Sequence, residues 1–95
     1  MAYYVYILSC RPHGALYTGV TSDLLRRMEQ HRSGQVRGHT AKYNIHTLAW
    51  CEVYKDLSAA RLREKRIKRW RRAWKLDLIT KTNPTWRDLA TEIPY

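Results

Sequence analysis

Two short apolar segments near the start of the chain, joined by a tight turn, constrain the fold more than any other feature. Residues 3–10 read YYVYILSC, and their aromatic and β-branched side chains are apolar at odd and even positions alike, which is typical of a strand covered on both faces. The turn-forming sequence RPHG follows, and residues 15–20 (ALYTGV) then predict a second strand. A four-residue loop places both strands in one antiparallel hairpin.

The rest of the chain predicts one further strand and several helices. A helix is expected from near Asp23 to the glycine-containing SGQVRG segment, and a third strand over residues 48–54. A long helix, either continuous or broken near Trp70, is expected from about residue 56 to residue 79, and a short last helix is expected to start at Pro84. The order β-β-α-β-α-α predicts an α+β fold, a small three-stranded antiparallel sheet flanked by helices, with residues 1–95 forming a single domain.

The charge of the chain predicts an anionic partner. Its net charge is +10, and residues 61–75 hold nine Arg or Lys but only one acid. A solvated helix face is the alternative, but so many uncompensated cations repel one another, which favours nucleic acid as the partner. Three cations on the outer surface of this helix are predicted to hold the phosphate backbone: Arg63, Arg66 and Arg69.

Cysteine usage and the first ten residues both indicate a cytoplasmic protein. Cys10 and Cys51 lie in apolar, strand-like contexts and are interpreted as reduced thiols. The N-terminal apolar run lacks a basic region and is too short for a signal peptide or a membrane span. A zinc site is not expected, because three of the histidines have no metal-like spacing with each other or with the cysteines: His13, His39 and His46.

The hairpin predicts a candidate site around two tyrosines. With a four-residue loop, Cys10 faces Ala15, and Tyr6 then lies opposite Gly19 with Tyr17 as its diagonal neighbour. Gly19 has no side chain, so the sheet face beside Tyr6 has room for another group. The alternative is that both tyrosines are core aromatics whose hydroxyls are satisfied.

These residues resemble a known family. Tyr4-Val5-Tyr6 precedes Tyr17-Thr18-Gly19, Arg27 follows ten residues after Tyr17, and a later helix carries a carboxylate. This ordered set is similar to the GIY-YIG nuclease domain, above all to its small single-domain bacterial members, over residues 3–89. The resemblance implies an endonuclease-like hydrolase of phosphodiester bonds in nucleic acid, DNA rather than RNA, with a role in DNA repair or recombination.

The resemblance also implies a role for each site residue. Tyr6 would be the general base or the phenol that orients the attacking water, and Tyr17 its partner at the scissile phosphate. Arg27 would steady the charged phosphate, with His31 beside it as proton acceptor or phosphate ligand. Because a free phenol with a pKa of about 10 is a poor base at neutral pH, Arg27, a metal or a histidine would have to favour the phenolate.

Glu64, the single acid in the basic segment, would be the metal ligand. On a helix it shares a face with Ala60 and Ile67, so it is predicted to point inward. One carboxylate is enough for Mg²⁺ (or Mn²⁺), which keeps several waters and also binds substrate phosphate. The alternative is an ion pair with Lys68 at i+4, which contributes about 0.3–0.5 kcal/mol. Two further polar residues are expected to contact nucleic acid: Tyr43 and Asn83.

Two other classes of function compete with a nuclease. A non-catalytic nucleic-acid-binding module on the same scaffold needs the basic helix but not an inward carboxylate. A basic interaction protein would bind an acidic protein or RNA. Trp70 and Trp74, four residues apart, are interpreted as core residues rather than base-stacking platforms. Specificity in so small a nuclease would come from a protein partner, a homodimer or the shape of the nucleic acid.

Overall fold

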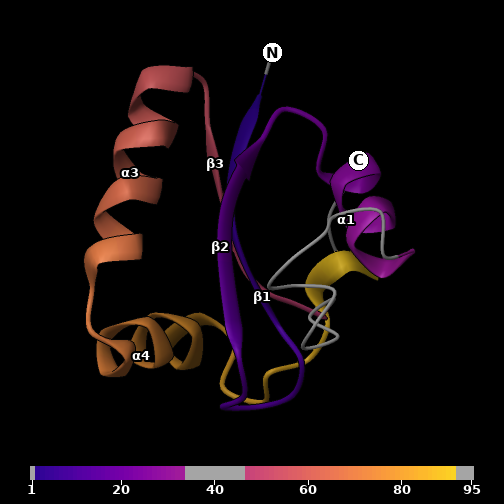
Figure 1. Cartoon of the computed structure of the whole chain (residues 1–95), viewed down its shortest axis with the longest axis vertical. Helices are drawn as coiled ribbons and strands as arrows, with labels where there is room; N and C mark the ends of the chain where they lie inside the picture. Colours follow the sequence, from indigo (N-terminus) through magenta and orange to yellow (C-terminus); the bar gives the residue numbers. More distant parts are fainter. Residues whose placement is uncertain (1, 34–46, 92–95) are drawn as a thin grey trace.

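The computed structural model describes residues 2–33 and 47–91, and their secondary structure follows the order predicted from the sequence (Figure 1). In chain order the elements are β1 (Tyr3–Ser9), β2 (Leu16–Thr21), α1 (Leu24–Arg32), β3 (Thr47–Tyr54), α3 (Leu57–Arg69), α4 (Arg72–Thr82) and the 3-10 helix η1 (Leu89–Thr91). The predicted α+β fold, a three-stranded antiparallel sheet flanked by helices, is therefore confirmed.

The sheet has the strand order β2-β1-β3, with β1 in the centre. This position suits the strand whose side chains are apolar on both faces. The backbone N–H of Cys10 donates a hydrogen bond to the carbonyl of Ala15 at 3.3 Å, which closes the four-residue loop and places Tyr6 opposite Gly19. The register predicted from the loop length is confirmed.

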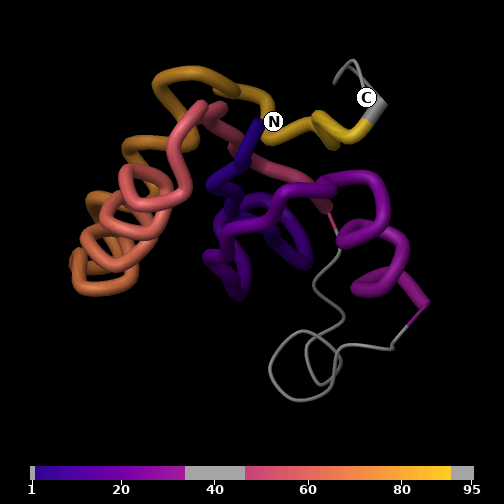
Figure 2. Tube along the Cα trace, turned by 90° about the horizontal axis from the view of Figure 1, so that it is seen from above, coloured from indigo at the N-terminus to yellow at the C-terminus, as the bar shows by residue number. Residues whose placement is uncertain are grey.

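Helices cover both faces of the sheet, so the molecule has three layers (Figures 1 and 2). Val5 and Ile7 of β1 pack on one face with side chains of α3 and α4. Tyr6 and Leu8 point to the opposite face, where they pack with side chains of α1 and η1. Alternation along β1 thus divides its side chains between two cores, and the predicted tyrosine site belongs to the core under α1.

The long C-terminal helical region is broken where the sequence predicts it. Trp70 and Arg71 have extended backbone conformations, with ψ of 148° and 154°, so α3 ends before them and α4 begins after them. The Arg72 side chain donates hydrogen bonds to the carbonyls of His13 and Gly14 in the β1–β2 turn, the first at 2.7 Å. This contact fixes the start of α4 against the hairpin.

Candidate active site

The phenol of Tyr6 lies at the centre of the sheet face that α1 covers. The side chain is fully buried, and its ring centroid is 6.3 Å from that of Tyr17. Gly19 leaves the space that this phenol occupies, because a Cβ atom at Gly19 would lie 2.5 Å from the Tyr6 hydroxyl oxygen. Two tyrosines therefore meet beside a glycine, as the hairpin register predicts.

Helix α1 brings a cation and an imidazole to the same phenol. Arg27 Nε donates a hydrogen bond to Tyr6 Oη at 3.4 Å, and His31 Nε2 lies 3.3 Å from the same oxygen. The ring of His31 also lies 5.1 Å from that of Tyr17, centroid to centroid. Gln30 holds the guanidinium of Arg27 through a hydrogen bond of 3.2 Å. The four residues that the resemblance assigns to catalysis thus form one cluster.

Burial controls the protonation of this cluster. It raises the pKa of Tyr6 to about 12, although the hydrogen bond from Arg27 acts in the opposite direction. Burial, reinforced by the charge of Arg27, lowers the pKa of His31 to about 4. Both groups are therefore neutral near pH 7, and the Tyr6 hydroxyl can donate a hydrogen bond to His31 Nε2. Arg27 favours the phenolate as expected from the sequence, but desolvation outweighs it.

Glu64 lies on α3, which covers the face of the sheet opposite α1 (Figure 1). Its side chain is only 18% exposed, and its Oε2 atom is 3.4 Å from Lys68 Nζ. The raised pKa of Tyr6 is due first to burial, and the Glu64 charge makes only the smallest of the contributions to it. The helix ion pair, which is the alternative to a metal role for Glu64, is thus present.

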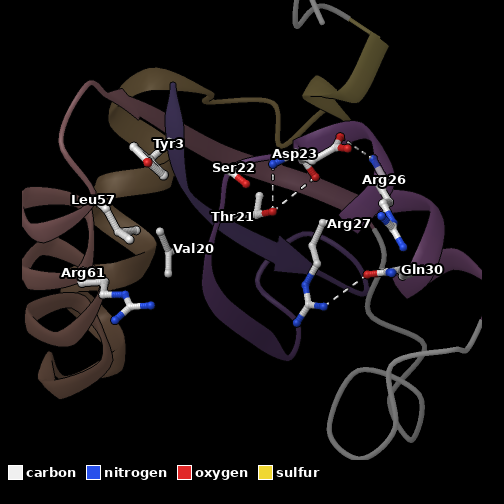
Figure 3. A pocket seen from close by; sticks show the side chains of 10 residues that line it. All are labelled: Tyr3, Val20, Thr21, Ser22, Asp23, Arg26, Arg27, Gln30, Leu57 and Arg61. Carbon is white, nitrogen blue, oxygen red and sulfur yellow. Dashed lines mark hydrogen bonds between the residues drawn. The ribbon is translucent and has the colours of Figure 1, made fainter. Parts of the chain in front are cut away.

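A pocket of about 430 Å³ connects the two sides of the sheet across its edge strand, β2 (Figure 3). Arg27 of α1 lines one side, Arg61 of α3 the other, and Val20 of β2 lies between them. Sequence reasoning did not single out Arg61. The feature of the sequence that could have identified Arg61 is its position three residues before Glu64, which places the two side chains near each other on one helix face. Cations on both sides make the pocket suited to phosphate.

The carboxylate that the resemblance assigns to a divalent cation is that of Glu64. The pocket itself is lined by another carboxylate, Asp23, which caps α1 by accepting a hydrogen bond from the backbone N–H of Arg26 at 3.1 Å. In the described part of the chain, no three His, Cys, Asp or Glu side chains are grouped so as to hold a metal ion. Mg²⁺ commonly uses one or two carboxylates, keeps several waters and binds phosphate oxygens of the substrate. A single part-buried carboxylate near a cationic pocket therefore fits Mg²⁺ or Mn²⁺, whereas structural zinc needs four protein ligands.

The three arginines predicted to hold the phosphate backbone have different surroundings. Arg66 and Arg69 are exposed on α3 and are free to meet a phosphate. Arg63 is paired with Glu52 at 3.2 Å, and its guanidinium lies 5.2 Å from the ring centroid of Trp70. Arg63 thus joins α3 to β3, in addition to any contact that it makes with nucleic acid. Tyr43 lies outside the described residues.

Asn83 has a position that sequence reasoning did not predict. Its side chain is fully buried at the end of α4, and its amide donates to the carbonyls of Ala49, at 3.0 Å, and Arg87, at 2.9 Å. Its Oδ1 atom accepts a hydrogen bond from the backbone N–H of Arg87 at 3.2 Å. A buried amide whose groups are satisfied by the backbone is not at the surface for nucleic acid, so we correct its assignment to a structural one.

Replacing Asn83 with alanine should therefore lower stability rather than remove a contact with nucleic acid. The change leaves backbone groups of Ala49 and Arg87 without partners, which costs roughly 1–3 kcal/mol. Urea denaturation followed by circular dichroism measures this loss. Metal-free affinity for DNA, measured well below the unfolding transition, should stay at the parent value. A weaker affinity without loss of stability would restore Asn83 to the interface.

The chain matches a known protein family over most of its length. The family model described as the GIY-YIG catalytic domain matches residues 2–77. The chain belongs to the GIY-YIG family. A UPF0213 protein of Fusobacterium nucleatum is 32% identical to it over 89 residues, which cover 94% of this chain and 88% of that protein. A UPF0213 protein of Staphylococcus aureus is 38% identical over 78 residues, which cover 82% of this chain and 94% of that protein.

A solved structure also resembles this GIY-YIG chain. The solution NMR structure of a UPF0213 protein from Bacillus halodurans matches it with a TM-score of 0.59 and 28% sequence identity, over 96% of both chains. GIY-YIG membership places the chain in a nuclease-like family, for which nucleic acid is the expected substrate class. No helix in residues 2–33 and 47–91 combines the length and the apolar character needed to cross a bilayer.

Proposed function

We propose that this protein is a divalent-metal-dependent nuclease that hydrolyses phosphodiester bonds in nucleic acid, with DNA favoured over RNA. The observation that carries the proposal is the convergence of Arg27 and His31 on the hydroxyl of Tyr6, next to a pocket lined by cations. Phosphodiester hydrolysis needs a positioned water, neutralised phosphate oxygens and help for the leaving alkoxide. The cluster and its pocket offer groups for the first two requirements.

Each residue of the cluster has a proposed role. Arg27 and Tyr17 are partly exposed, so they meet the scissile phosphate, with Arg27 neutralising its charge. Tyr6 orients the attacking water, and neutral His31 can accept a hydrogen bond from its hydroxyl and so hold the phenol in place. Glu64 would hold Mg²⁺ (or Mn²⁺). When bound, the ion supplies positive charge to the phosphate and the leaving oxygen.

One observation favours the second candidate, a nucleic-acid-binding module without catalysis. Tyr6 is fully covered in the free protein, and burial raises its pKa to about 12. Catalysis by this phenol therefore requires the site to open when the substrate binds, as catalytic sites often tighten or rearrange in the complex. A binding module needs no such opening.

Incubation with labelled nucleic acids separates the two candidates. The panel contains single-stranded, duplex, nicked and branched DNA and RNA, each incubated with Mg²⁺, with Mn²⁺ or with EDTA. We expect cleavage of at least one DNA with a metal and none with EDTA. Binding of the same DNA without cleavage, under all metal conditions, would support the binding module instead.

Arg27 provides a test at the level of one residue. Arg27→Lys keeps the positive charge but loses the planar fork that grips two oxygens and the Nε donor to Tyr6. We expect single-turnover cleavage to slow more than tenfold, while metal-free affinity changes by less than twofold. Arg11→Lys, in the exposed β1–β2 turn, is the matched control and should cleave at the parent rate. A lysine variant as fast as the parent would remove Arg27 from the proposed mechanism.

A further inference from the structure

An exposed indole on α4 departs from the sequence-based interpretation of Trp70 and Trp74 as core residues. Trp74 is 51% exposed, and Trp70, at the break before α4, is half-buried. Their rings meet edge to face, with centroids 6.1 Å apart and an angle of 79°. Ile79 of the same helix is buried in the core, and Trp70, Leu76 and Leu78 are partly buried against it. The interpretation as a core residue is therefore wrong for Trp74. Burial in the core does not explain why a tryptophan occupies this position.

The two indoles form one wall of a shallow apolar pocket of about 270 Å³. Leu78 and Lys81 continue this surface along α4, and Asp77 is its acid. Trp74, Asp77, Leu78 and Lys81 follow one face of α4 at spacings of three or four residues, and Trp70 joins them from the break before the helix. We call this surface the tryptophan patch.

Positive charge surrounds the tryptophan patch. The guanidinium of Arg71 lies 5.1 Å from the ring centroid of Trp74, a cation–π arrangement. Arg69 is exposed just before the break, and Lys81 is exposed at the far end of the pocket. The single acid, Asp77, is outnumbered. An aromatic surface bordered by cations is complementary to a ligand that has both flat rings and negative charge.

The charge also argues against a second copy of this chain as the occupant. Each copy carries a net charge of +10, so two basic patches brought face to face would repel each other. Nucleic acid meets the requirement in another way, because its unpaired bases stack on indoles while its phosphates pair with arginine and lysine. Paired bases in a duplex are already stacked and offer no free face to Trp74.

We propose that the tryptophan patch binds an unpaired nucleobase, with the neighbouring phosphates on Arg71 and Lys81. This rests on nucleic acid being the substrate of the proposed function, and it adds that the preferred substrate has a single-stranded part. The patch belongs to α4, on the sheet face opposite α1 (Figure 1). It is therefore a second contact, separate from the cluster around Tyr6.

Fluorescence and anisotropy titrations in EDTA test this proposal without any cleavage. A labelled oligothymidylate and a duplex of equal length are titrated into the parent, Trp74→Ala and Trp74→Phe proteins. Removal of a base-stacking residue costs about 1–3 kcal/mol per base, so Trp74→Ala should weaken single-strand binding at least fivefold. Duplex affinity should change less than twofold, and Trp74→Phe should retain most of the parent affinity for single strands. Binding of the oligothymidylate should quench the tryptophan fluorescence of the parent protein, and Trp74→Ala should lose most of this quenching.

Leu25→Ala, which truncates another exposed apolar side chain on α1, is the matched control and should bind both oligonucleotides as the parent does. Equal losses on duplex and single strand, or no loss on either, would overturn the proposal. Two further results would overturn the proposal. One is a complex with poly-glutamate, and the other is a dimer in gel filtration, in each case dependent on Trp74 and not displaced by single-stranded DNA. If the patch proposal fails but Trp74→Ala still cleaves duplex DNA at the parent rate, the proposed nuclease function stands.

Discussion

Replacing Glu64 with glutamine should abolish cleavage while binding of nucleic acid without metal stays the same or tightens. Glutamine preserves the shape and the hydrogen bonding of the side chain but removes the anion that a hard cation needs. The loss of a negative charge near the cationic pocket also removes a repulsion on the phosphate. Isothermal titration of Mg²⁺ and single-turnover cleavage, on parent and variant, measure the two expected losses. Stability should change by no more than about 0.5 kcal/mol, because Lys68 in the lost ion pair is mostly exposed.

Lys68→Gln separates the metal site from the helix ion pair. It breaks the same ion pair but leaves the Glu64 carboxylate in place, so cleavage and Mg²⁺ affinity should remain close to the parent values. If the ion pair were the whole role of Glu64, the two variants would behave alike, with small and equal losses of stability. Equal Mg²⁺ affinity in the parent and Glu64→Gln proteins would therefore return Glu64 to a purely structural role.

The sequence predicted the parts of the site that depend on local geometry. A four-residue loop determines the register of a hairpin, and that register alone places Tyr6 opposite Gly19 and on the same face as Tyr17. The spacing of four between Arg27 and His31 likewise places both on one side of α1, where they reach the same hydroxyl. These predictions succeeded because each used a fixed period along a single element or hairpin.

The remaining features depend on contacts between distant segments, which no local pattern reports. Asn83 is structural because the carbonyl of Ala49, 34 residues earlier, lies next to its amide. Arg63 is partly covered because β3 presents Glu52 beside it. Trp74 is exposed because the break at Trp70 begins a new helix, so spacing carried over from the preceding helix no longer indicates which side is buried. The protonation of Tyr6 depends on its burial, and burial is a property of the whole fold.

A second large effect is expected at Gly19, where a single added methyl group should abolish the proposed cleavage. The Cβ atom of Gly19→Ala would lie 2.5 Å from Tyr6 Oη, 2.7 Å from Tyr6 Cζ and 3.1 Å from Tyr17 Cε1. Since Tyr6 is fully buried, its ring has no solvent to move into, and overpacking of this kind costs about 1–3 kcal/mol. The displaced hydroxyl would lose its contacts with Arg27 and His31, so cleavage should fall more than a hundredfold.

Tyr6→Phe and the double variant Tyr6→Phe/Gly19→Ala make this expectation specific to the phenol. Tyr6→Phe alone should lose cleavage with little loss of stability, because it removes the oxygen that Arg27 and His31 contact while the ring still fills the core. Adding it to Gly19→Ala removes the closest clash but leaves the 2.7 Å approach to Cζ, so stability should be recovered only in part and cleavage should stay absent. Chemical denaturation of the four proteins gives the coupling energy between the two positions. Strictly additive losses would mean that the alanine methyl does not press on the Tyr6 hydroxyl, and that Gly19 supports the site in some other way.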